Sequence, residues 1–279
     1  MESNKLKFLI QLLDDQNKEV YTIVRNELLR MGEQSLPKLK EEWLKLPKNN
    51  LLSDRLYDII ININVNTYKY KFREWVEQEE PDLFLGLFYL NKIYHSEINF
   101  DTLKQQLNQI LDNIALTSRN NYTILEKINI INHFLFKEMD YKVQTEITEH
   151  NHFFDTAFLG KLLNPITSLL LYYQICNYFG ISIKPIIAGK AFLLATIKPS
   201  AKTKEIIEKK DLSFFILPPG KGTIINKDFR IKNKDLNNNI YDIIKHWISQ
   251  TILLLKEREE DIYYKTYQSL LKNLINEKA

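Results

Sequence analysis

The segment from Ile166 to Phe179 is apolar on almost every face, and it constrains the fold more than any other feature of the chain. A helix at a protein surface keeps a polar stripe, so this pattern predicts a helix that is buried on all sides. Asn164 is a favoured N-cap residue, and Pro165 suits the first helical position, where a missing N–H costs nothing. Gly180 supplies the end of the helix. We therefore expect a buried helix at the centre of the fold.

Short runs rich in β-branched and aromatic residues follow this helix and predict a small sheet. The predicted strands cover 181–183, 192–197, 212–217 and 223–225. Elsewhere apolar residues recur with the period of an α-helix, and glycine and proline are sparse. The predicted helices cover 5–13, 18–30, 36–46, 82–94, 100–116, 123–137, 237–255 and 262–275, with a polar loop over 140–151.

The first helices resemble a HEAT-type repeat, in which paired helices stack through their apolar faces. One unit is visible over 5–46, and residues 51–76 are interpreted as a second, degenerate unit. An ordinary helical bundle is an equally good interpretation. The sequence therefore predicts an α+β, mostly helical chain. We expect a HEAT-like helical region over 1–97, a core with a small antiparallel sheet over 98–232, and a C-terminal helical extension over 233–279.

The composition of the chain argues against several classes of protein. The chain has 38 lysine and arginine residues against 35 aspartate and glutamate residues, a balance that argues against a nucleic-acid partner, and we expect no membrane partner either. The sequence has no apolar run long enough for a membrane span, and its start lacks the apolar core of a signal peptide. A single cysteine, Cys176, fits the reducing cytoplasm and leaves no cysteine zinc site. We expect a cytoplasmic protein without a cofactor or metal.

Five short motifs occur in one order along the chain: Ile131–Phe136, Asn151–Asp155, Asn164–Tyr172, Gly189–Phe192 and Leu217–Gly222. Together they resemble the bacterial transglutaminase-like proteins of the SirB type, and the resemblance covers about Phe100 to Ile225. It implies a papain-like core in which a buried helix packs on an antiparallel sheet. A helical N-terminal region also resembles members of this family.

In active members of that fold, a cysteine at the N-terminus of the central helix is the nucleophile, and a histidine and an aspartate on following strands handle its proton. The resemblance places these roles at Thr167, Ala191 and Leu217. Alanine cannot act as a base and leucine accepts no hydrogen bond, so all three roles are vacant. We therefore expect a non-catalytic binding, scaffold or regulatory module whose partner is another protein or a peptide.

Residues close to these positions define a candidate cleft and an alternative function. The cleft candidates are Asn151, His150, His152, Thr167, Lys190 and Lys221. The alternative is an active hydrolase or acyltransferase that uses Thr167 or Cys176 with His150 or His152. An imidazole within hydrogen-bond reach of Thr167 or Cys176 would favour it. A metal shared by His150 and His152 lacks completing ligands. A HEAT-like nucleic-acid binder is disfavoured because acidic residues interrupt any basic stripe.

Overall fold

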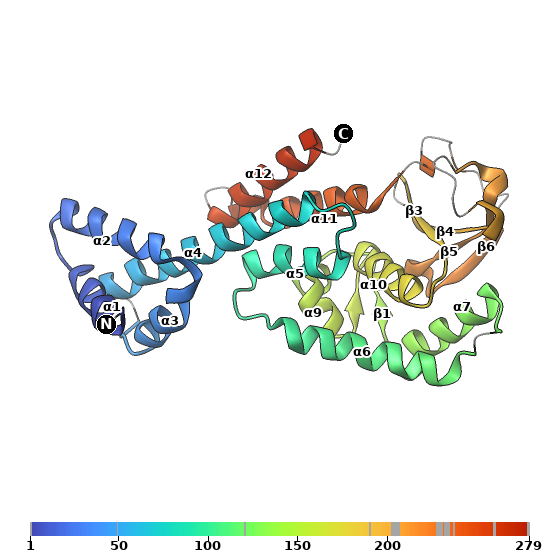
Figure 1. Ribbon diagram of the computed structural model, residues 1–279, viewed down its shortest axis with the longest axis horizontal. Coiled ribbons are helices and arrows are strands. Elements are labelled where there is room, and N and C mark those ends of the chain that lie inside the picture. The colour runs from blue at the N-terminus through green and yellow to red at the C-terminus, as the bar shows by residue number, and fades with distance from the viewer. Residues whose placement is uncertain are drawn as a thin grey trace. The chain divides into compact units, whose positions relative to one another are not determined.

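The computed structural model describes residues 2–48, 50–119, 121–189, 191–201, 207–226, 231, 235, 236, 238–258 and 261–277. The chain divides into two compact units (Figure 1). The first comprises Met1–Asp82 and Tyr89–Glu97, and the second comprises Leu83–Phe88 and Ile98–Ala279. The boundary expected between 232 and 233 lies outside the described residues. The expected division into three regions stays a prediction.

The first unit is helical, as predicted. Its helices are α1 (Glu2–Leu12), α2 (Lys18–Met31), α3 (Leu36–Leu44), α4 (Leu51–Val76) and the last part of α5 (Leu83–Tyr94). Asn17 caps α2 by accepting a hydrogen bond from Glu19 N–H, so the turn between the first two helices lies where the sequence indicated. Apolar side chains of α1–α4 and of the turn after α1 form one core, which includes Leu13, Leu28 and Leu39.

The prediction of a second, degenerate HEAT unit over 51–76 is wrong, because these residues form the single continuous helix α4. A HEAT unit needs two helices joined by a turn. Asn50 caps the start of α4, and its interior contains neither glycine nor proline to break it. The HEAT-like character of the first unit stays a prediction.

The second unit is built around α10 (Pro165–Tyr178), which begins as predicted. The Asn164 side chain accepts hydrogen bonds from Ile166 N–H and Thr167 N–H, at 2.8 and 2.9 Å. Gly180 adopts a left-handed conformation at φ +64°, and Ile181 N–H bonds back to the carbonyl of Cys176. Such a closure is typical of a helix end with glycine just beyond the cap. It also explains why the first strand starts at Ile183 and not at Ile181.

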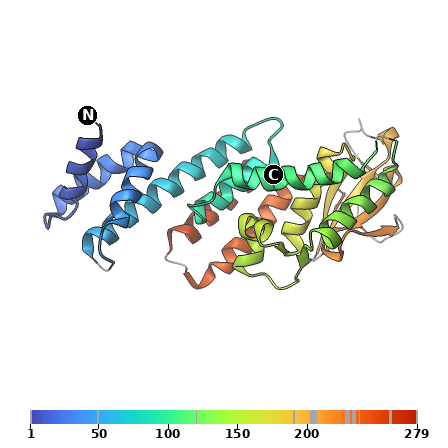
Figure 2. The ribbon, with the colours of Figure 1, turned by 90° about the horizontal axis from the view of Figure 1, so that it is seen from below.

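A four-stranded antiparallel sheet follows α10, in the order β3-β4-β5-β6. The strands are β3 (Ile183–Ala188), β4 (Ala191–Ile197), β5 (Leu212–Leu217) and β6 (Thr223–Asn226). Helix α10 packs on β3 and β4, and the two views show it beside the sheet (Figures 1 and 2). The small sheet and its central helix are thus confirmed.

Further helices of the second unit come before and after this helix and sheet. They are the first part of α5, α6 (Phe100–Thr117), α7 (Ile124–His133) with a π-helical turn at Phe134–Glu138, α8 (Glu149–His152), α9 (Phe154–Leu159), α11 (Ile240–Leu254) and α12 (Ile262–Glu277). The expected loop over 140–151 contains structure that the sequence did not predict. Its strand β1 (Lys142–Val143) pairs in parallel with β2 (Leu162–Leu163), and its last residues belong to helix α8. Among the described residues, none of the helices is apolar over a span that would cross a bilayer.

Candidate functional site

The backbone N–H groups at the start of α10 are used within the helix cap. Pro165 has no N–H, and the N–H groups of Ile166 and Thr167 both donate to Asn164 Oδ1. The next N–H, that of Ser168, donates to the carbonyl of Asn164. A helix N-terminus binds an anion or a thiolate through N–H groups that are free. In this cap, the first turn offers none.

The Thr167 hydroxyl is fully buried and turned into the protein. It donates to the carbonyl of Asn151 at 3.0 Å and accepts from Asn164 N–H at 2.8 Å, which completes a capping box. Its remaining close contacts are oxygens of Asn164. No imidazole is among the hydrogen-bond partners of this hydroxyl within the described part of the chain.

His152 is fully buried and joins α8 to α10 and α11. Its ring stacks on Trp247, with centroids 4.8 Å apart. Thr251 donates its hydroxyl hydrogen to the carbonyl of Trp247, so His152 Nε2–H donates to Thr251 Oγ1, at 2.8 Å. Nδ1 then accepts from Asn164 Nδ2 at 3.2 Å. Burial lowers the pKa of His152 to about 3, so the ring is neutral at pH 7.

Of the other candidates, Asn151 contacts Thr167 through its carbonyl, and Lys221 lies elsewhere. Asn151 is fully buried and caps α8, with its Oδ1 accepting from Thr148 N–H and its Nδ2 donating to the carbonyl of Glu146. His150 is exposed. Lys221 is exposed and lines a separate pocket of about 420 Å³ with Asn132 and other residues. Lys190 lies outside the described residues. Asn151, His152 and Thr167 thus belong to one buried hydrogen-bond network through Asn164, whereas Lys221 lines another pocket. A cleft shared by the whole candidate set stays a prediction.

Cys176 is fully buried on α10, and burial raises the pKa of its thiol. We predict that iodoacetamide will not label Cys176 in the folded protein and will label it fully after unfolding in urea, because the reactive species is an accessible thiolate. Mass spectrometry of the intact chain measures the labelling. Tyr178, two residues along the same helix, is 59% exposed, so the double variant Cys176→Ala/Tyr178→Cys is the matched control. Equal labelling rates in native buffer would contradict the prediction.

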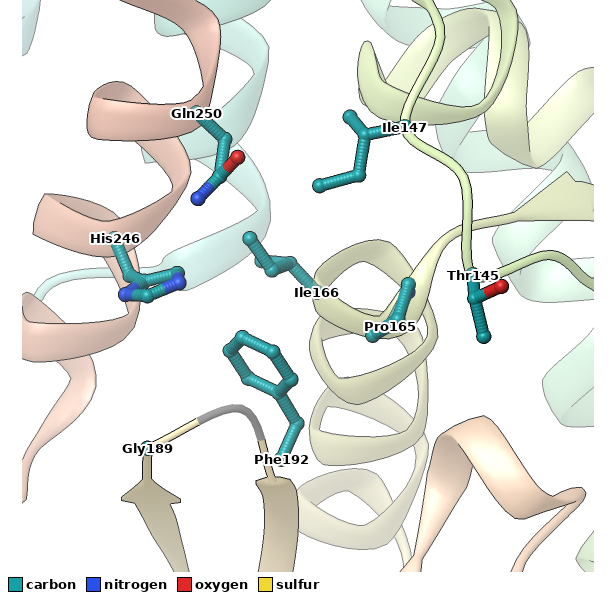
Figure 3. A pocket seen from close by; sticks show the side chains of 8 residues that line it. All are labelled: Thr145, Ile147, Pro165, Ile166, Gly189, Phe192, His246 and Gln250. Atoms are coloured by element: carbon teal, nitrogen blue, oxygen red, sulfur yellow. The ribbon is translucent and has the colours of Figure 1, made fainter. Parts of the chain in front are cut away.

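A pocket of about 500 Å³ lies at the N-terminus of α10 (Figure 3). It is lined by Thr145, Ile147, Pro165, Ile166, Gly189, Phe192, His246 and Gln250. The side chains of Ile166 and Phe192 point into it from the helix and from β4. The side chains that α10 and β4 contribute to it are apolar.

Comparison with known families fits this architecture. Residues 101–231 match the family model of the transglutaminase-like superfamily. The chain contains a transglutaminase-like domain. No curated protein and no solved structure matches the chain. The matched segment begins in α6 and ends beyond β6, so α11 and α12 follow the transglutaminase-like domain.

The pocket residues of the transglutaminase-like domain are neighbours of the positions that the sequence indicated. Thr167 follows Ile166, and successive helical residues point about 100° apart. Ala191 precedes Phe192, and successive strand residues point to opposite faces. As a result Ile166 and Phe192 face the pocket, while Thr167 faces Asn151. Leu217, the third expected position, ends β5 and does not line the pocket.

Three motif residues of the transglutaminase-like domain form one structural network. Tyr172 O–H donates to Asn132 Oδ1 at 2.6 Å, and Asn132 Nδ2 donates to the carbonyl of Gly222 at 3.0 Å. Gly222 has φ +71°, and a Cβ atom there would overlap the Asn132 side chain. These residues hold α7, α10 and the turn before β6 together, so their presence reflects the fold.

Helix α11 contributes the polar part of the pocket, which the sequence analysis missed. His246 and Gln250 are one helical turn apart and both point into the pocket (Figure 3). His246 is half-buried with its ring edge-on to Phe192, and burial lowers its pKa. The i, i+4 spacing on an amphipathic helix was the available signal. In the described part of the chain, no three His, Cys, Asp or Glu side chains cluster in a way that could hold a metal.

Proposed function

We propose that the transglutaminase-like domain is a non-catalytic binding module and that the pocket at the N-terminus of α10 holds its partner. One observation carries the proposal: apolar Pro165 and Ile166 occupy the helix start, and the N–H groups there are bonded to Asn164. Acyl transfer needs a nucleophile, a base within reach of its proton, and donors for the oxyanion. The first turn of α10 supplies none of these three.

The lining of the pocket supports a partner that inserts an apolar group. Ile147, Ile166 and Phe192 point toward one another across it (Figure 3). Burying an apolar side chain there contributes about 1.5–3 kcal/mol. We propose that this group belongs to another protein or a peptide, and that the chain acts as a scaffold or regulator. The motif order supports a bacterial, SirB-type member of the superfamily, and the single cysteine supports a cytoplasmic location.

The test is an assay of the purified full-length protein on a panel of amide and ester substrates, including glutamine-containing peptides. We expect no turnover above that of heat-unfolded protein, because none of the described hydrogen-bond partners of the Thr167 hydroxyl is a base. Thr167→Ala and Thr167→Ser variants should give the same result as the unchanged protein. Turnover that Thr167→Ala abolishes and Thr167→Ser retains would contradict the proposal. It would support the alternative function of a hydrolase or acyltransferase.

A further inference from the structure

Two polar side chains face the pocket without a protein partner among the described residues. The ring nitrogens of His246 and the carboxamide of Gln250 take part in no hydrogen bond there, and both groups project from α11 toward Ile166 and Phe192 (Figure 3). A half-buried imidazole that lacks a partner is costly unless a ligand or solvent satisfies it. Two donors one helical turn apart can both reach one planar acceptor.

The described lining of the pocket is compatible with an anionic acceptor. None of the described lining residues is acidic, and His246 is the one ionisable group among those described. The described residues that line the pocket with His246 from other elements are uncharged: Phe192 on β4, Ile166 and Pro165 on α10, and Thr145 and Ile147 before α8. On its own helix, Lys245 is paired with Asp242 at 3.6 Å. An anion in the pocket would therefore meet donors and no carboxylate.

The remaining walls specify the rest of the ligand. An apolar side chain fits between Ile147, Ile166 and Phe192, within about 500 Å³. A ligand with a carboxylate next to an apolar side chain would satisfy both halves of the pocket. The last residue of a polypeptide has this arrangement, with the carboxylate and the side chain on one carbon atom.

We propose that the pocket binds the C-terminal carboxylate of a protein or peptide whose last side chain is apolar, with His246 and Gln250 donating to the carboxylate. This inference rests on the proposed binding function. Protonated His246 binds a carboxylate more strongly than neutral His246 does, so binding takes up a proton and strengthens as the pH falls. The lowered pKa of His246 leaves the free ring neutral at pH 8, which makes that uptake measurable.

The test compares matched probes by isothermal titration calorimetry with the full-length protein. The probes are N-acetyl-leucine, N-acetyl-leucinamide, and a five-residue peptide ending in leucine with a free or an amidated C-terminus. We expect the free-acid peptide to bind at least about tenfold more tightly than its amide, because one charge-assisted hydrogen bond contributes that difference in affinity. The preference should grow between pH 8 and pH 6. N-acetyl-leucine should show the same preference with weaker binding.

Two variants assign the preference to the two donors. His246→Gln keeps a donor but cannot take a charge, so it should remove the pH dependence. Gln250→Met keeps the size and loses the donors, so it should reduce the acid preference severalfold. His133→Gln is the control, since His133 is exposed and lines the other pocket. Circular dichroism melts check that each variant folds.

The outcomes separate this inference from the proposed function. Acid and amide probes that bind equally in all variants would overturn the carboxylate site and leave the binding module standing. Binding of N-acetyl-leucine without binding of the free-acid peptide would overturn the chain end as the partner. No binding of any probe, with an Ile166→Glu variant equally inert, would overturn the use of this pocket altogether.

Discussion

Lowering the pH from 7 to 5 should remove about 2 kcal/mol from the free energy of unfolding through His152 alone. His152 is neutral in the folded protein, since burial lowers its pKa to about 3, whereas an unfolded histidine has a pKa of about 6.5. The unfolded state therefore binds one more proton between these two values. This stabilisation is complete above pH 6.5 and is lost progressively as the pH falls toward 3. Half-buried His246 adds a loss of the same sign.

Urea unfolding at pH 7, 6 and 5 measures this loss. The His152→Gln variant should be less stable at pH 7 and should show a smaller loss on acidification. His150→Gln is the matched control, because His150 lies two residues away and is exposed. The Cε1–H resonance of His152 should not shift between pH 8 and 5. A His152 that titrates near 6.5 in the folded protein would contradict the prediction.

Gly222→Ala should destabilise the protein by about 3 kcal/mol. A left-handed backbone costs an alanine about 1 kcal/mol, and overpacking a filled site costs about 1–3 kcal/mol more. Gly222 has φ +71°, and the added Cβ would overlap the side chain of Asn132. Asn132 cannot move away freely, because it bonds both Tyr172 and the carbonyl of Gly222. Chemical denaturation measures the loss.

Gly189→Ala separates the two costs. Gly189 has φ +63°, close to that of Gly222, but nothing lies within 4 Å of the Cβ position. This control should lose only about 1 kcal/mol, the cost of the backbone conformation. In an Asn132→Ala background the cost of Gly222→Ala should fall to a similar value. Equal losses in Gly222→Ala and Gly189→Ala would show that the contact with Asn132 is unimportant.

The sequence predicted the elements whose signals are local. Asn164, Pro165 and Gly180 bound α10 because capping and turn preferences act within a few residues. The strands β5 and β6 also lie where their composition indicated. The strand pair β1–β2 was not predicted, because each strand has only two residues and the two strands are separated in sequence by α8 and α9. Alternation cannot be read from two residues.

The candidate site was harder to predict, because it depends on side-chain direction and on contacts distant in the chain. The sequence indicated Thr167 at the N-terminus of α10. Successive helical residues point about 100° apart, so Ile166 faces the pocket and the Thr167 hydroxyl faces Asn151. His246 and Gln250 come from a helix that begins well after the sheet. Their i, i+4 spacing places them on one face of a helix, but their position beside Phe192 depends on how α11 packs, which is a contact between residues distant in the chain.

Hydrogen bonds connect Asn164 through His152 to Thr251, which lies beyond the end of the family match, so the choice of domain boundary affects this network. A fragment ending at residue 231 would retain the whole family match and yet discard Trp247, which covers the His152 ring and donates to its carbonyl. The His152 ring would then be exposed to water, and its hydrogen bond to Asn164, the N-cap of α10, would be weakened. We therefore expect a fragment that ends at residue 231 to be less stable than one that includes α11.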